Sequence, residues 1–320
     1  MNTLLALVLL AVGLLMLGKC ASLLVSGAVS LANRLGVSPL VIGLTVVAMG
    51  TSAPEVAASI AAALRNAGDV AIGNVYGSNI ANLALVGGIC ALIRPVSIKK
   101  QTLRQQIPVM LIVAILLWPV LHNLYLARLE GLGLLAVFAG LILLTVYLAR
   151  KERKQLAKYK MPDTRHKIRD TKKSILFVAI GLAGLALGAD LTVRGAVFLG
   201  QKMGLSCAVI GLTIIAIGTS LPELATSVAA SLKGQQDISI GTLVGSNIFN
   251  TLLVTGVAGS IRPFALSARL AGVDYWVMVL ISAGFAVVAI AAKGVIGRPG
   301  GALLLCSYLG YILYLLAFSI

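Results

Sequence analysis

Long runs of apolar residues, separated by short polar segments, fill most of this 320-residue chain. A helix needs about 20 largely apolar residues to cross the hydrocarbon core of a bilayer. Ten runs approach that length, and we expect each to form a transmembrane helix: 3–31, 37–64, 70–93, 107–121, 127–149, 174–200, 205–232, 238–260, 273–292 and 301–318. The pattern therefore predicts an all-α polytopic membrane protein with ten transmembrane helices.

Composition supports the membrane interpretation and argues against a soluble protein. Hydrophobic residues make up 59% of the chain and charged residues 11%, and the mean hydropathy is +1.02, whereas soluble domains carry roughly 25% charged residues. A net charge of +16 would suggest a nucleic-acid partner, but aromatic content is 5% and the basic residues lie between apolar runs. We expect the lipid bilayer as partner, without nucleic acid or an obligatory protein partner.

Apolar runs also hold all four cysteines, which we expect to be packed thiols rather than a metal or disulfide framework: Cys20, Cys90, Cys207 and Cys306.

The distribution of Lys and Arg predicts the topology, because these residues accumulate in cytoplasmic loops. With the N-terminus outside, the inner connections hold 19 Lys and Arg and the outer ones hold 5. Segment 150–173 alone holds eleven of the 19. We predict that both termini lie outside and that 150–173 is a basic cytoplasmic loop. Short loops and the lack of a targeting peptide favour the plasma (inner) membrane of a prokaryote.

The chain contains an internal repeat. Segment 41–95 aligns with 209–263 at a constant offset of 168, without a gap, and 30 of the 55 positions are identical. Each half has five predicted spans, so the second half enters the membrane in the opposite direction. Inverted repeats are typical of secondary transporters, which bind substrate near the midplane. We therefore predict two inverted five-helix repeats, 1–149 and 174–320, joined by 150–173.

Two glutamates occupy equivalent repeat positions inside predicted spans. Glu55 and Glu223 each follow a Gly-Thr-Ser-x-Pro sequence, and the proline predicts a helix break just before each carboxylate. An ionised carboxylate within a bilayer is costly unless it is paired or faces a polar cavity. The third acidic residue deep in a span, Asp190, has no acidic counterpart; we expect it to pair with Arg194, one turn on, in a structural role.

A second motif, Gly-Ser-Asn-x-x-Asn, lies in the span after each glutamate. Its spacing puts Ser78 and Asn82 on one helix face, and likewise Ser246 and Asn250. Together with the glutamates they form an all-oxygen set with two negative charges, which suits Ca²⁺. Paired His and Cys ligands, which zinc or copper would favour, are missing; His122 and His166 lie in predicted connections, where we expect solvated side chains. No phosphate-binding loop is present, so an ion gradient or downhill flow must drive transport.

At these motifs the chain resembles the cation/calcium exchanger superfamily, in particular its prokaryotic sodium/calcium exchangers. Segments 50–55 with 77–82, and 218–223 with 245–250, look like the two α-repeats of that family. The resemblance implies a Na⁺/Ca²⁺ antiporter without cofactors, in which the first and sixth spans slide over a fixed core. It implies Glu55 and Glu223 as central Ca²⁺ ligands, with further Ca²⁺ and Na⁺ ligands from the carbonyls of Ala48 and Ala216 and from Thr51, Ser52, Ser78, Asn82, Thr219, Ser220, Ser246 and Asn250.

Alternatives remain open at this stage. Many relatives have Asp at one of the positions of Asn82 and Asn250, and Asn at both weakens the case for an additional K⁺ site. The two carboxylates could bind Na⁺ or H⁺, so a H⁺-coupled Ca²⁺ or Mn²⁺ exchanger is the nearest alternative, and a passive cation channel is less favoured. We predict no enzymatic activity, because the motifs hold no His or Lys that could activate a nucleophile.

Overall fold

A computed structural model describes residues 2–158, 171–203 and 216–318. Within these ranges seven helices are long and apolar enough to cross a membrane, and a bent helix pair raises the number to as many as eight. These helices coincide with eight of the ten predicted spans. The predicted span 205–232 begins in residues 204–215, outside the described part, and 301–318 falls on the helix Arg298–Phe318. The count of ten stays a prediction.

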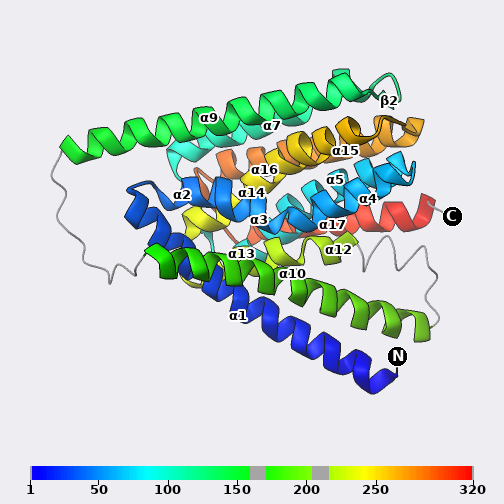
Figure 1. The fold of residues 1–320 in the computed structure, drawn as a ribbon, viewed down its shortest axis with the longest axis horizontal. Helices are drawn as coiled ribbons and strands as arrows, with labels where there is room; N and C mark the ends of the chain where they lie inside the picture. The colour runs from blue at the N-terminus through cyan, green and yellow to red at the C-terminus, as the bar shows by residue number, and fades with distance from the viewer. Residues whose placement is uncertain (1, 159–170, 204–215, 319–320) are drawn as a thin grey trace.

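The first half of the chain folds into helices, π-helical segments (η) and two short strands (Figure 1). They are α1 (Thr3–Leu35), α2 (Pro39–Ile42), η1 (Gly43–Val47), α3 (Ala48–Thr51), α4 (Ala53–Leu64), α5 (Gly68–Ile80), η2 (Ala81–Val86), α6 (Gly87–Ile93), β1 (Val96–Ser97), η3 (Thr102–Gln106), α7 (Ile107–Leu116), α8 (Trp118–Leu121), β2 (Tyr125–Leu126) and α9 (Arg128–Lys158).

The second half repeats most of this order. It contains α10 (Thr171–Lys202), α12 (Ala216–Thr219), α13 (Leu221–Leu232), α14 (Gln236–Phe249), η5 (Asn250–Val254), α15 (Thr255–Ile261), β3 (Phe264–Ala265), η6 (Leu270–Asp274), α16 (Tyr275–Ala291), β4 (Val295–Ile296) and α17 (Arg298–Phe318). Helices α4 and α13 have equivalent bounds, as do β1 and β3, so the repeat seen in sequence is also a repeat of local structure.

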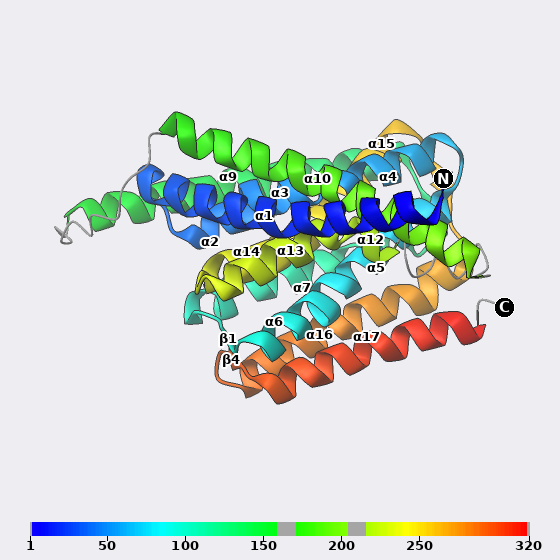
Figure 2. The same ribbon diagram turned by 90° about the horizontal axis from the view of Figure 1, so that it is seen from below.

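The four short strands were not predicted. They form two antiparallel pairs, β1 with β4 and β2 with β3. Strand β2 lies at one end of the molecule (Figure 1) and the β1–β4 pair at the other (Figure 2). Equivalent strands of the two halves therefore lie at opposite ends. Both chain termini lie at the same end as β2 (Figure 1).

Helices α1 and α10 run side by side along one face of the molecule (Figures 1 and 2). Glycines allow their backbones to approach closely: a Cβ atom at Gly13 would lie 2.7 Å from the carbonyl oxygen of Gly188, and one at Gly181 would lie 2.9 Å from the Cα atom of Leu24. Small residues at such seams favour close helix packing in lipid. Larger residues at either glycine would force the two helices apart.

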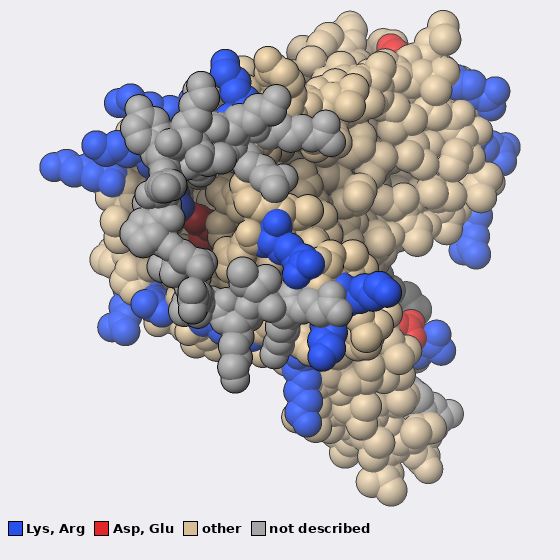
Figure 3. Space-filling view, turned by 60° about the vertical axis from the view of Figure 1, so that its left-hand side comes forward, with Lys and Arg blue, Asp and Glu red and all other residues tan. Residues whose placement is uncertain are grey.

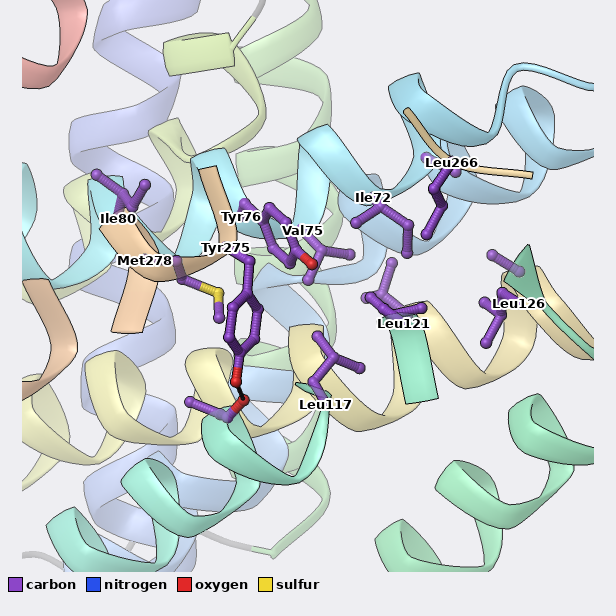
Figure 4. Packing of buried hydrophobic residues seen from close by; sticks show 14 of the residues in the cluster. Ile72, Val75, Tyr76, Ile80, Leu117, Leu121, Leu126, Leu266, Tyr275 and Met278 are labelled. Atoms are coloured by element: carbon purple, nitrogen blue, oxygen red, sulfur yellow. Dashed lines mark hydrogen bonds between the residues drawn. The ribbon is translucent and has the colours of Figure 1, made fainter. Parts of the chain in front are cut away.

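The interior is filled by apolar side chains from both halves (Figure 4). Tyr76 of α5 and Tyr275 of α16 meet edge to face with ring centroids 6.1 Å apart. The Tyr275 hydroxyl donates a hydrogen bond of 3.1 Å to the carbonyl of Ala114, which satisfies the polar end of an otherwise buried ring.

The prediction of four packed thiols is only partly right. Cys90 is buried and Cys20 is half-buried, but Cys306 is exposed on α17. An apolar run in lipid does not need to bury every residue inside the protein, because the outward face is already in an apolar solvent. Cys207 lies outside the described residues.

Candidate cation-binding site

Both glutamates lie in the first turn of a helix that starts at a break. Helix α3 ends at Thr51 and α4 begins at Ala53, and the two helices are bent by 43°. The second half has the same break at Ser220, between α12 and α13. A proline is tolerated in the first helical turn, where no intrahelical donor is needed, and the positive end of the helix dipole favours a carboxylate. The predicted breaks are confirmed.

Hydroxyl groups from both halves surround the two glutamates, which are completely buried. Ser52 donates to Oε1 of Glu223 at 3.0 Å, and Ser246 donates to the same oxygen at 3.4 Å. Ser78 donates to Oε1 of Glu55 at 3.4 Å. The bond from Ser52 joins the first copy of the repeat to the glutamate of the second. The structure therefore brings the two copies together around one buried site.

Several polar atoms of this site have no hydrogen-bond partner among the described residues. They are the Oε2 atoms of Glu55 and Glu223, both amide atoms of Asn82 and of Asn250, and Oγ of Ser220. A buried polar group without a partner costs about 1–3 kcal/mol, and more when it is charged. Oxygens of carboxylates, amides and hydroxyls are the ligands that hard cations prefer. The arrangement is suited to binding a desolvated cation.

The other residues named from the resemblance lie near the helix breaks. Thr51 is buried, and its hydroxyl donates to the carbonyl of Ala48 at 3.2 Å. The same carbonyl accepts the backbone N–H of Ser52 at 3.0 Å. Thr219 is the partly buried last residue of α12, and Ala216 is its first residue. Their roles as ligands stay predictions.

Sequence reasoning missed the polar group behind Glu55. The Asn74 amide donates to the carbonyl oxygen of Glu55 at 3.1 Å and to the hydroxyl of Ser59 at 3.0 Å. Ser59 in turn donates to the carbonyl of Ala71 at 3.0 Å. These bonds fix α4 to α5 just behind the carboxylate. The available signal was the repeat itself, which places Thr242 where the first copy has Asn74.

Two further carboxylates lie away from the glutamate pair. Asp190 pairs with Arg194 at 2.7 Å, and the two side chains are 47% and 67% exposed, so the predicted pairing is confirmed. Asp274, which the sequence did not single out, is buried and lies 3.4 Å from Nε of Arg269.

The histidines were expected to be solvated loop residues rather than ligands. His122 is exposed beside the carbonyl of Pro119, and His166 lies outside the described residues. No cluster of three or more His, Cys, Asp or Glu occurs within the described ranges. The site therefore depends on two carboxylates and neutral oxygens.

Comparison with known proteins places these observations in a family. The family described as sodium/calcium exchanger protein matches residues 5–149 and 173–317. The inner membrane protein YrbG of Escherichia coli (strain K12) is 38% identical over 307 residues, covering 94% of each chain. The sodium/calcium exchanger MaX1 of Methanosarcina acetivorans is 33% identical over 340 residues, covering 96% of this chain and 97% of its own. A solved structure of the sodium-calcium exchanger NCX_Mj, soaked with Na⁺ and Sr²⁺, superposes with a TM-score of 0.83 at 30% identity, covering 98% of this chain and 99% of that one.

Proposed function

The chain belongs to the sodium/calcium exchanger family, and from that premise we propose that it is a secondary antiporter that exchanges Ca²⁺ for Na⁺ at the site of Glu55 and Glu223. Membership of this family makes the protein a multi-pass membrane transporter of cations. The choice of Na⁺ as the driving ion, and of the two glutamates as the central ligands, is the proposed part.

One observation carries the proposal. Seven buried polar atoms without a partner among the described residues belong to five residues named as ligands: Glu55, Asn82, Ser220, Glu223 and Asn250. Ca²⁺ takes six to eight oxygen ligands, and two carboxylates balance its charge. A cation at this position would satisfy oxygens that are otherwise costly to bury. The amide nitrogens of Asn82 and Asn250 share a rotatable group with an oxygen, so either amide can turn its oxygen inward.

The arrangement of the two halves supports an inverted repeat with both termini outside. Strand β1 of the first half pairs with β4 at one end of the molecule, and its counterpart β3 of the second half pairs with β2 at the other end (Figures 1 and 2). Lys and Arg side chains gather around the end at which α9 ends and α10 begins (Figure 3). Under the rule that basic residues accumulate in the cytoplasm, this end faces inward.

Alternating access then has an identifiable moving part. Helices α1 and α10 pack chiefly against each other through the glycine seam, so they can shift as one body. The remaining helices carry the glutamates and the asparagines. In the proposed mechanism the α1–α10 pair slides across this core and opens the site to one side at a time, as the family resemblance implies.

The test is Ca²⁺ uptake into proteoliposomes loaded with Na⁺ and diluted into Na⁺-free buffer at equal pH on both sides. We expect uptake that requires internal Na⁺ and that disappears in the double variant Glu55→Gln/Glu223→Gln. The matched control is Asp190→Asn, a carboxylate outside the site, which should retain uptake. Uptake that ignores Na⁺ but follows an acidic interior would assign H⁺ coupling instead. Flux that needs no counter-ion would indicate a channel.

A further inference from the structure

Three charged side chains lie on the outer surface of the α1–α10 pair, where lipid would surround a single chain. Lys19 of α1 is exposed, and its ammonium group has no ion pair or hydrogen bond with any described residue. The side chains of Asp190 and Arg194 on α10 are also exposed. The two helices lie at the edge of the molecule, with no described helix beyond them (Figure 1). Charged residues in transmembrane segments almost always pair or face a polar cavity, so this surface calls for a partner.

Lys19 points away from the rest of the protein. Leu17, two residues earlier, is buried, and two residues correspond to about 200° around a helix. Leu15, one turn from Lys19, is exposed. On α10, Asp190 lies one turn from the exposed Leu187 and therefore shares its outward side. The lysine and the aspartate thus both belong to the surface that the α1–α10 pair turns outward.

The depth of Lys19 excludes the head groups of the lipids as its partner. It is the central residue of α1, which has 33 residues. At 1.5 Å per residue it lies about 24 Å from either end of the helix. The head groups begin about 15 Å from the middle of a bilayer, and a lysine can reach them only from a position near a helix end. A partner for this ammonium group must therefore come from protein.

Asp190 has the complementary charge at nearly the same depth. A Cβ atom at Gly188 would lie 3.2 Å from the backbone nitrogen of Leu17, so these two residues are level. The helices run in opposite directions (Figure 1), which places Lys19 level with residue 186 and Asp190 about 6 Å further along α10. The carboxylate uses Oδ2 for Arg194, and a carboxylate can accept further hydrogen bonds through its other oxygen.

We propose that two copies of this chain associate in the membrane through the outward faces of their α1–α10 pairs, with Lys19 of each copy bound to Asp190 of the other. A two-fold axis is the commonest symmetry of oligomers. When it lies along the membrane normal, it places α1 of each copy against α10 of the other and leaves every depth unchanged. The offset of about 6 Å can be spanned by the four methylene groups of the lysine.

Small residues beside the lysine allow such an approach. A Cβ atom at Gly18 would meet nothing within 4 Å, and Ala183 and Ala186 of α10 are exposed near the same level. Helices associate in lipid through close packing at small residues and through polar contacts between helices. The other carboxylates deep in spans, Glu55 and Glu223, are completely buried, so Asp190 is the acceptor that a second copy offers.

The dimer is independent of the proposed ion exchange. The axis along the membrane normal keeps both copies in the same orientation, so the two α1–α10 pairs can shift together in the direction of the normal without losing the contact. Its tests count and crosslink chains and involve no measurement of flux, so that the dimer and the antiport can fail separately.

The first experiment counts chains by single-molecule photobleaching in liposomes of phosphatidylethanolamine and phosphatidylglycerol, over a series of protein-to-lipid ratios. We expect a dimer whose association constant falls at least about tenfold in Lys19→Leu, which introduces the residue that the second half has at the equivalent position, Leu187. The matched control is Lys173→Leu, the same change at an exposed residue in the first turn of α10, which should leave association unchanged. A wild-type chain that is monomeric at every ratio, or an unchanged constant in Lys19→Leu, would overturn the proposal.

The second experiment locates the interface by disulfide crosslinking between two differently tagged chains without native cysteines. One chain carries Gly18→Cys and the other Ala186→Cys, and we expect oxidation in liposomes to join them. The control carries Leu309→Cys in both chains, on the exposed face of α17, and should give no crosslink. A crosslink at the control position alone, or none at either position, would overturn the assignment of this surface.

Discussion

Helices α4 and α13 begin with the same Ser-x-Pro-Glu segment and end at equivalent residues, but the polar groups behind their glutamates are arranged differently. Behind Glu55 the amide of Asn74 ties α4 to α5 through the backbone of the glutamate and through Ser59. Behind Glu223 three buried hydroxyls of α13 have no protein partner in the described part of the chain: those of Thr226, Ser227 and Ser231. The first arrangement is completed by protein hydrogen bonds, whereas the hydroxyls of the second have no partner among the described residues.

The difference extends to the carboxylates. Glu223 accepts a hydrogen bond from Ser52 of the other half and one from Ser246 of its own half. Glu55 accepts one from Ser78, while the hydroxyl of Ser220, equivalent to Ser52, has no partner among the described residues. A duplicated motif can therefore keep the same charged groups and still hold them differently. The residues behind each carboxylate decide how firmly its side chain and backbone are held.

The largest expected effect tests whether the halves differ at the glutamates themselves. Glu55→Gln and Glu223→Gln should each lower Ca²⁺ exchange by at least about 100-fold, because removing one partner of a buried charge costs about 3–5 kcal/mol and each 1.4 kcal/mol is roughly tenfold. Initial rates of radiolabelled Ca²⁺ uptake at matched protein density would measure this. A variant that kept more than a tenth of the wild-type rate would show that only one half supplies an essential carboxylate.

The hydrogen bonds of Asn74 behind Glu55 should give an effect of intermediate size. Asn74→Ala removes the donors to Glu55 and Ser59 and should lower the free energy of unfolding by about 1–3 kcal/mol. Its second-half control is Thr242→Val, which keeps the volume of this completely buried side chain and removes only a bond within the same helix; it should change the free energy of unfolding by about 1 kcal/mol or less. Thermal or denaturant unfolding in detergent would compare the two. Equal losses of stability would mean that the polar residues behind the two glutamates stabilise the protein to the same degree, which would contradict the structure.

Sequence predicted the two helix breaks and the buried polar residues of the repeats better than the contacts around them. Proline, glutamate and asparagine recur in both copies, and each has a strong physical consequence that holds in any membrane span: a broken helix, a costly charge and a buried amide. The role of Asn74 depends on which side chain faces it from α4, and periodicity alone does not reveal that contact. The exposed Cys306 and the pairing of the buried Asp274 with the half-buried Arg269 escaped prediction for a related reason, since hydropathy does not distinguish a lipid-facing residue from a packed one.

The smallest effect concerns the ends of α4 and α13, where the halves differ in how they contact the α1–α10 pair. Lys233, at the end of α13, donates to the carbonyl of Ser22 and, at 2.7 Å, to the hydroxyl of Ser26, both on α1. The equivalent residue of the first half, Arg65, is exposed, and its side chain forms no hydrogen bond or ion pair with any described residue. The positions on α10 that correspond to Ser22 and Ser26 are those of Asp190 and Arg194, which pair with each other.

Lys233→Met should therefore loosen α1 at this end, whereas Arg65→Met should leave α10 unchanged. Because the lost bonds are exposed, we expect about 0.5–1.5 kcal/mol, or roughly a two- to tenfold faster amide hydrogen exchange over residues 20–28 of α1. Hydrogen exchange with mass spectrometry on the ion-free protein would measure both helices in one experiment, with residues 188–196 of α10 as the matched region. Equal acceleration of α1 in Lys233→Met and of α10 in Arg65→Met would mean that the pair is held alike at its two ends. The difference between the halves would then be confined to the polar groups around the glutamates.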